Sequence, residues 1–174
     1  MKYQDCIAPV QAPAETAAGV ARLADANINP RTGLATDYLN HFNEAVMLLE
    51  MLAACPDCAE DFLAWRPMSY REHFAASRFK SRDLAIAAYD AAAPGARADL
   101  DALTATMTVV LEATRAAMCI GTAPETAGKI ATGSATCLKP LIARAGAVIN
   151  GDTEDGEPMT PQAIVDGLMG QASL

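Results

Sequence analysis

The chain has 174 residues, of which 52% are hydrophobic and 20% charged, and its formal net charge is −8. This length and composition fit a single domain that buries a core without disulfides, and they exclude a disordered chain. The negative charge argues against a nucleic-acid binder, which would normally be basic. Only 5% of the residues are aromatic, so much of the apolar content is alanine, which favours packed helices over strands.

The two ends of the chain are expected to lie outside the main domain. Residues 1–13 contain two prolines and are expected to form an irregular arm, residues 14–150 a helical-bundle domain, and residues 151–174 an acidic loop with a short C-terminal helix. The first residues lack the apolar run of a secretory signal, and no stretch reaches the roughly 20 apolar residues of a membrane span. We therefore expect a cytoplasmic protein.

A short helix is expected over Ala14–Ala26, and the clearest helical pattern follows at Thr36–Ala54. Apolar residues in that second segment recur at spacings of three and four and make one half of the helix apolar. Thr36 is the expected N-cap. Met47 and Met51 lie on the opposite, polar half. They indicate a partner surface or a second packing neighbour, or else they are singly exposed apolar residues.

Prolines divide the middle of the chain into short helical segments. Three helices are expected between residues 56 and 95: Asp57–Trp65, Ser69–Phe79 and Arg82–Ala93. Ser69 is the expected N-cap of the second helix, and Glu72 three residues later completes a capping box. Ser81 is the expected N-cap of the third helix, and Pro94 is expected to end it.

Two long helical segments follow. Arg97–Cys119 is apolar on two nearly opposite sides, which is typical of a central bundle helix or of an oligomer interface. Pro124–Asn150 is expected to form one long helix, or two helices joined near Gly133 or Pro140. No segment has the pattern of a strand. The sequence therefore predicts an all-α helical bundle of about four to six main helices with short accessory helices and no sheet, and a homo-oligomer stays open.

The chain has two histidines, His41 and His73, and each lies in a Tyr-x-x-His-Phe sequence. Two helices that each offer one histidine can hold a metal or a haem, and Glu44 lies one turn from the first histidine. We therefore name His41, Glu44 and His73 as candidate metal ligands. The alternative is that both histidines lie at the edge of the core and bond to a neighbour. The Glu-x-x-His motifs of di-iron carboxylate proteins are absent.

The five cysteines include a Cys55-x-x-Cys58 pair beside a helix-breaking proline. An odd number of cysteines favours free thiols over a disulfide framework. The pair is a candidate redox dithiol or part of a metal site. However, a thioredoxin-like dithiol needs a βαβ context, and a structural zinc site needs four ligands. The alternative is two cysteines near a helix end with no special role.

Residues 65–82 form a basic aromatic segment. It carries five basic residues against one acidic residue, a net charge of +4, together with a tryptophan, a tyrosine and two phenylalanines. Arginine and aromatic side chains together favour an anionic or planar ligand, or an acidic protein partner, through charged hydrogen bonds and stacking. The candidate ligand-binding residues are Tyr38, His41, Trp65, Tyr70, Arg71, Phe74, Arg78 and Arg82. The alternative is a solvated basic face whose aromatic side packs into the core.

No segment of the sequence carries a motif that identifies a reaction. We therefore expect a non-enzymatic helical bundle, without a cofactor, that binds a protein partner or an anionic or planar small ligand. The alternative function is a metal- or haem-binding sensor or redox protein that uses His41 and His73, with or without the Cys55 and Cys58 dithiol.

Overall fold

The computed structural model describes residues 17–52, 58–118 and 122–152. These residues form seven α-helices and one short 3-10 helix, and they contain no strand. The elements are α1 (Ala17–Asp25), η1 (Thr36–Tyr38), α2 (Leu39–Met51), α3 (Cys58–Ala64), α4 (Tyr70–Ala76), α5 (Arg82–Ala91), α6 (Pro94–Met118) and α7 (Pro124–Asn150). The all-α prediction is confirmed. The expectations for residues 1–13, for Cys55 and for residues 153–174 lie outside the described residues.

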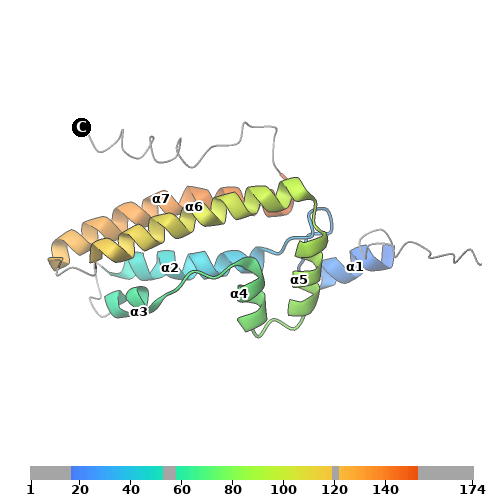
Figure 1. Ribbon diagram of the computed structural model, residues 1–174, viewed down its shortest axis with the longest axis horizontal. Helices are drawn as coiled ribbons and strands as arrows, with labels where there is room; N and C mark the ends of the chain where they lie inside the picture. The colour runs from blue at the N-terminus through green and yellow to red at the C-terminus, as the bar shows by residue number, and fades with distance from the viewer. Residues whose placement is uncertain (1–16, 53–57, 119–121, 153–174) are drawn as a thin grey trace, which may run out of the picture.

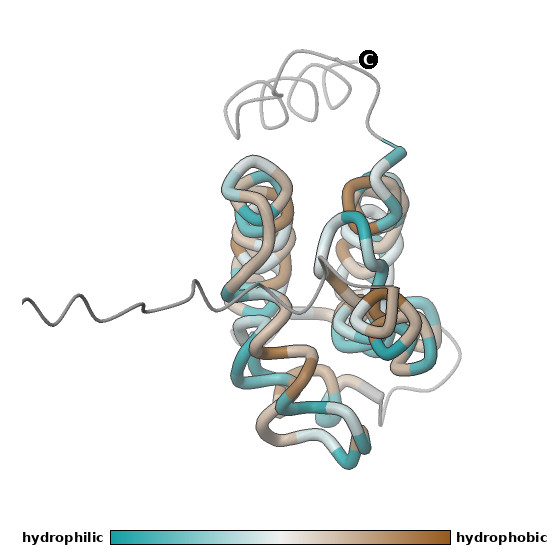
Figure 2. Tube along the Cα trace, turned by 90° about the vertical axis from the view of Figure 1, so that its right-hand side faces the viewer, coloured by the Kyte–Doolittle hydropathy of each residue, from teal (hydrophilic) through white to brown (hydrophobic). Residues whose placement is uncertain are grey.

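The three longest helices form the body of the bundle. Helices α6 and α7 lie side by side along the molecule, and α2 runs beneath them and packs on α7 (Figure 1). Helices α4 and α5 lie below α6 and run across the direction of the long helices (Figure 1). In the view along the long helices, hydrophobic residues of α6 and α7 face each other (Figure 2). No helix of the described residues is long and apolar enough to cross a membrane.

The hydrophobic core lies between these helices. Its largest fully buried side chains are Ile28, Leu34, Phe42, Leu49, Phe62, Phe74, Leu100, Met107, Leu111, Leu138 and Ile149. Helix α7 also buries Ala131, Ala135 and Ala145, whose small side chains let its backbone approach α2 and α6 closely. A 2.7 Å hydrogen bond between the hydroxyls of Thr114 and Ser134 joins α6 to α7.

The starts of α4 and α5, after Ser69 and Ser81, were predicted correctly, and the start of α2 after Thr36 was predicted incorrectly. Ser69 caps α4 with a complete capping box, in which Glu72 accepts from the Ser69 backbone N–H at 2.8 Å. Thr36 is not the N-cap of α2, because residues 36–38 form η1 and α2 begins only after it. Ser81 precedes α5, but its side chain makes no capping bond, since its backbone is not in the extended conformation of an N-cap.

Proline positions explain two further boundaries. Helix α5 ends at Ala91, and Pro94 opens α6, because a proline in the first helical turn loses no hydrogen bond that the helix would otherwise make. Helix α7 continues through Pro140, so the single long helix is the correct alternative. The ring of Pro140 is exposed, and the carbonyl that loses its helical donor there, that of the exposed Thr136, can be hydrated. Gly151 ends α7 with a left-handed φ of 73°.

Met47 and Met51, on the polar side of α2, are 51% and 46% exposed. Within the described part of the chain, therefore, no second packing neighbour covers them. Val109, on the alanine-rich side of α6, is 63% exposed. Of the two apolar sides of α6, only the one with Leu100, Met107 and Leu111 is buried.

Candidate functional site

The two histidines come from different helices and meet in space. His41 on α2 is 4% exposed, and His73 on α4 is half-buried. Their ring centroids lie 5.9 Å apart. Tyr38 lies beside them, with its ring centroid 5.6 Å from that of His73. The two Tyr-x-x-His-Phe sequences thus form one aromatic cluster between α2 and α4.

His41 holds the linker of residues 65–69 that joins α3 to α4. Its ring stacks on the indole of Trp65 with centroids 4.5 Å apart. Its Nε2 accepts a 3.0 Å hydrogen bond from the Met68 backbone N–H. Its backbone carbonyl accepts a 3.3 Å bond from the Trp65 indole. From α6, Arg115 donates to the Trp65 carbonyl at 3.1 Å. This linker is therefore fixed to α2 and to α6.

Both histidines are neutral at neutral pH. Burial lowers the pKa of His41 to about 4, and the neighbouring His73 lowers it further in the same direction, while a hydrogen bond to the Arg66 backbone opposes this. Burial also lowers the pKa of His73, against the raising effects of Asp37 and Glu44. A neutral imidazole is the form that can accept the Met68 N–H bond.

The three candidate metal ligands line one small pocket. His41, Glu44 and His73 surround a hollow of about 400 Å³ beside Asn40 and Ser77. Among the described residues, however, no group of three or more His, Cys, Asp or Glu side chains is arranged so that it could hold a metal ion. One imidazole nitrogen of His41 is also engaged by Met68.

The Cys55-x-x-Cys58 pair falls largely outside the described residues. Cys55 is not described, and Cys58 is described only by its backbone, as the first residue of α3. Cys137 on α7 is a free thiol, and burial raises its pKa, so its reactive thiolate form is disfavoured. The proposed redox role of the pair stays a prediction.

A larger groove of about 740 Å³ is lined in part by residues 67–69 of the same linker. We call it the tyrosine–arginine groove. Its walls come from residues 67–69, from Tyr38, Tyr70 and Tyr89, and from the α6 residues between Arg97 and Val109. It is thus built by η1, the linker, α4, α5 and α6. Met68 lines both this groove and the smaller histidine pocket.

Tyr89 is the centre of the polar contacts in this groove. Its ring stacks on that of Tyr70 with centroids 4.5 Å apart and an angle of 15° between the planes. The guanidinium carbons of Arg71 and Arg97 lie 5.9 Å and 5.8 Å from its ring centroid. Its hydroxyl donates to Asp101 at 2.6 Å. Two cations therefore lie close to one aromatic ring that lines the groove.

The two arginines are held differently. Arg71 forms an ion pair with Asp90 and is 59% exposed. Arg97 donates a 3.2 Å hydrogen bond to the backbone carbonyl of Asp90, a neutral acceptor. Burial raises the pKa of Tyr38 to about 12 and also raises those of Tyr70 and Tyr89. The tyrosines of the groove are therefore uncharged hydrogen-bonding groups at neutral pH.

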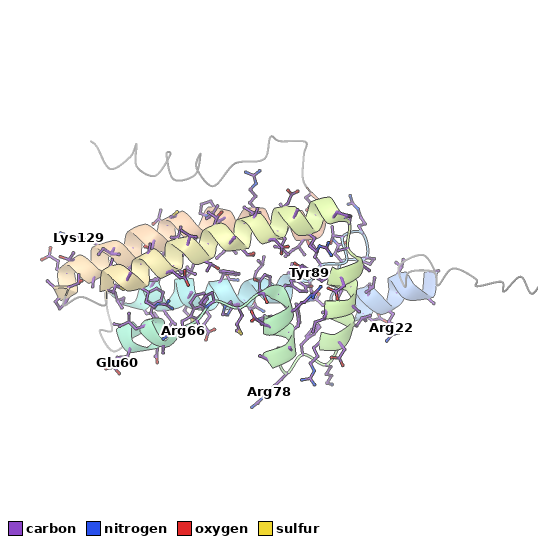
Figure 3. The ribbon with its side chains drawn as sticks, in the orientation of Figure 1. Arg22, Glu60, Arg66, Arg78, Tyr89 and Lys129 are labelled. Atoms are coloured by element: carbon purple, nitrogen blue, oxygen red, sulfur yellow. The ribbon has the colours of Figure 1, made fainter. Side chains whose placement is uncertain are left out.

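The predicted ligand-binding residues separate into four places. Tyr38, Tyr70 and Arg71 line the tyrosine–arginine groove, and His41 lines the histidine pocket. Trp65 and Phe74 are buried in the core at 8% and 0% exposure, so their rings pack inside the protein. Arg78 and Arg82 lie near the turn between α4 and α5, away from the groove, and Figure 3 shows Arg78 pointing outward there.

Sequence reasoning missed half of the groove. Tyr89, Arg97, Asp101 and the threonines at 104 and 108 come from α5 and α6, beyond the basic aromatic segment. Figure 3 shows Tyr89 on α5 where that helix meets α6. The sequence feature that indicates this half of the groove is Tyr89 near the end of α5, followed by Arg97 in the first turn of α6. It is informative only once α5 is known to fold back against α6.

No protein-family model, curated protein or solved structure matches this chain.

Proposed function

We propose that this chain is a non-enzymatic helical-bundle protein that binds a small ligand with an anionic group and a planar or apolar part. The proposed site is the tyrosine–arginine groove. The observation that carries the proposal is the placing of Arg71 and Arg97 around the Tyr89 ring at the edge of one hollow of about 740 Å³.

The size and lining of the groove support a small ligand. Binding sites for small molecules are typically hollows of about 300–1,000 Å³ with a mainly apolar lining and a few placed polar groups. Here Pro67, Ala105 and Val109 supply apolar surface, and the tyrosines supply rings for stacking. A guanidinium offers paired N–H donors that match a carboxylate or phosphate.

The same lining supports a binding role over catalysis. The groove contains neither histidine nor cysteine. Its serine, Ser69, is used in the capping box of α4, where its hydroxyl donates to Glu72 at 2.7 Å and accepts from the Glu72 backbone N–H, so this hydroxyl has a structural role. A protein partner stays the other occupant to be tested, and the exposed Val109 at the rim is where it would add contact.

The proposal is tested with 3-phenylpropanoate, which has one carboxylate and one ring. From its size we expect a dissociation constant on the order of 1 mM for the unmodified chain, measured by isothermal titration calorimetry. Arg71→Glu should abolish this binding, because it places a second negative charge beside Asp90 at the groove, where it repels the carboxylate of the ligand. The variant should keep the helical circular-dichroism signal, because the Arg71 side chain is exposed. Arg78→Glu makes the same charge change outside the groove and serves as the control. Equal loss in both variants, or unchanged binding in Arg71→Glu, contradicts the proposal.

A second proposed function is a metal- or haem-binding sensor or redox protein centred on His41 and His73. The observation that favours it is the 5.9 Å separation of the two imidazole rings. A ligand there must compete with the Met68 N–H for Nε2 of His41. An absorption spectrum and an elemental analysis of protein purified without a histidine tag test it. A stoichiometric metal or a Soret band that disappears in His41→Ala supports it, and a colourless, metal-free protein contradicts it.

A further inference from the structure

The tyrosine–arginine groove contains charges of both signs. Arg97 and Asp101 both line it, and they lie four residues apart on α6. Side chains at this spacing share one helix face and commonly pair when their charges are opposite. Among the ion pairs of the described residues, none joins Arg97 to Asp101. A cation and a carboxylate therefore lie one helical turn apart in the groove without neutralising each other.

The partners of the two side chains explain why they stay separate. The guanidinium of Arg97 is drawn toward α5, where it lies near the Tyr89 ring and donates to the Asp90 carbonyl. A guanidinium has five N–H donors, so this single bond leaves further donors for a ligand. Asp101 accepts from the Tyr89 hydroxyl through both carboxylate oxygens, at 2.6 Å and 2.9 Å. A hydroxyl does not cancel the negative charge, and the carboxylate can still accept from a cation.

The charge balance favours a ligand that is itself neutral overall. Arg71 is paired with Asp90, which leaves Arg97 and Asp101 as the two opposite charges of the groove without an ionic partner in the described residues. A ligand with only a carboxylate satisfies Arg97 but approaches Asp101 with the same sign of charge. A zwitterion satisfies both. Removing water from a charge is favourable only when a partner replaces that water, so the zwitterion is the better match.

From this arrangement we infer that the ligand is a free α-amino acid with an aromatic or other large apolar side chain. The inference rests on the proposed function of the groove. The carboxylate binds Arg97, and the ammonium group binds Asp101. The side chain then lies against the apolar wall of Pro67, Ala105 and Val109 and the neighbouring tyrosine rings.

The test compares three ligands that differ by one charged group each: L-phenylalanine, 3-phenylpropanoate, which lacks the ammonium, and phenethylamine, which lacks the carboxylate. Isothermal titration calorimetry is performed on the full-length chain. L-phenylalanine should bind about tenfold more tightly than either single-charge ligand, because each missing ion contact costs about that factor. Asp101→Asn should remove the advantage of L-phenylalanine over 3-phenylpropanoate, since asparagine keeps an acceptor for Tyr89 but has no charge. Asp99→Asn makes the same change at an exposed position of α6 that does not line the groove, and it should leave the tenfold ratio unchanged.

The outcomes separate this inference from the proposed function. If L-phenylalanine and 3-phenylpropanoate bind equally in the unmodified chain, and Arg97→Gln weakens both, the groove binds anions and the amino-acid inference is wrong. If neither acid binds, both the inference and the proposed function are wrong. If L-phenylalanine binds but Asp101→Asn keeps its full advantage, the ammonium is bound elsewhere and the inference is wrong.

Discussion

Acidification is expected to destabilise this protein through His41. The imidazole is buried, stacks on Trp65 and accepts the Met68 N–H, so the folded state binds its neutral form. Its pKa is lowered from 6.5 to about 4 on folding. Above pH 6.5, where His41 is neutral in both states, the free energy of unfolding carries no penalty from this residue. As the pH falls from 6.5 toward about 4, the free energy of unfolding decreases, because His41 takes up a proton in the unfolded chain and not in the folded one.

The size of the effect follows from the shift. One pKa unit corresponds to about 1.4 kcal/mol, so the whole shift amounts to about 3 kcal/mol, of which about 2 kcal/mol is lost by pH 5. This is a large fraction of a typical domain stability of about 5–15 kcal/mol. His73, whose pKa is also lowered, adds to the loss in the same direction. The steepest dependence on pH should lie between the two His41 pKa values.

Urea denaturation followed by circular dichroism at pH 7, 6 and 5 measures this dependence. The His41→Gln variant is the comparison, because its side-chain oxygen can accept the Met68 N–H but takes up no proton in this range. Carboxylates titrate equally in both proteins, so the difference between the two slopes isolates His41. The unmodified protein should lose about 2 kcal/mol more than the variant between pH 7 and pH 5. Parallel slopes refute the assignment of His41 as a neutral, buried linker contact.

Three further predictions concern Trp65, Gly33 and Ser69. Acid should quench the fluorescence of Trp65, the single tryptophan, as the stacked His41 becomes charged. His73→Gln should move the midpoint of this quenching to higher pH, because His73 lowers the pKa of His41. An unmoved midpoint contradicts this. Gly33→Ala should lower the free energy of unfolding by about 2 kcal/mol or more, because Gly33 has a φ of +73° and a Cβ there would lie 2.8 Å from the Ala88 carbonyl oxygen. The control Gly133→Ala lies in the middle of α7 with open space for a Cβ, so it should raise the free energy of unfolding by about 0.5–1 kcal/mol. Ser69→Ala should cost about 1 kcal/mol in thermal or urea denaturation through loss of the α4 capping box, and no measurable change would show that the cap is not stabilising.

Local sequence signals predicted the helices well where the cause of the structure is itself local. The capping box at Ser69 depends on two side chains three residues apart, so the sequence alone contains it. Thr36 and Ser81 also have the right residue type, but Thr36 lies inside η1, and the backbone of Ser81 is not in the extended conformation of a capping residue. Pro140 remains inside α7 because it is exposed at that position, which depends on how the helix packs.

The candidate site was predictable only in part, since it is formed by helices distant in sequence. The repeated Tyr-x-x-His-Phe pattern does correspond to a spatial cluster, although the pattern does not contain the 5.9 Å approach of the rings. The aromatic residues around Trp65 and Phe74 were interpreted as a ligand surface. Both rings are instead buried in the core, which has few other aromatic side chains to fill it. Arg97 and Asp101 lie in an ordinary amphipathic helix, and only the packing of α5 on α6 gives them a common groove.

The measurement that tests the central proposal most directly is a series of ¹H–¹⁵N NMR spectra of the chain during titration with 3-phenylpropanoate. If the tyrosine–arginine groove is the binding site, the amide signals that shift should be those of its walls, from Ser69 to Arg71 and from Asp101 to Thr108. The signals of the α4–α5 turn around Arg78, which is equally basic but lies outside the groove, should stay in place. Shifts centred on that turn or on the histidine pocket, or no shifts at millimolar ligand, would contradict the proposal.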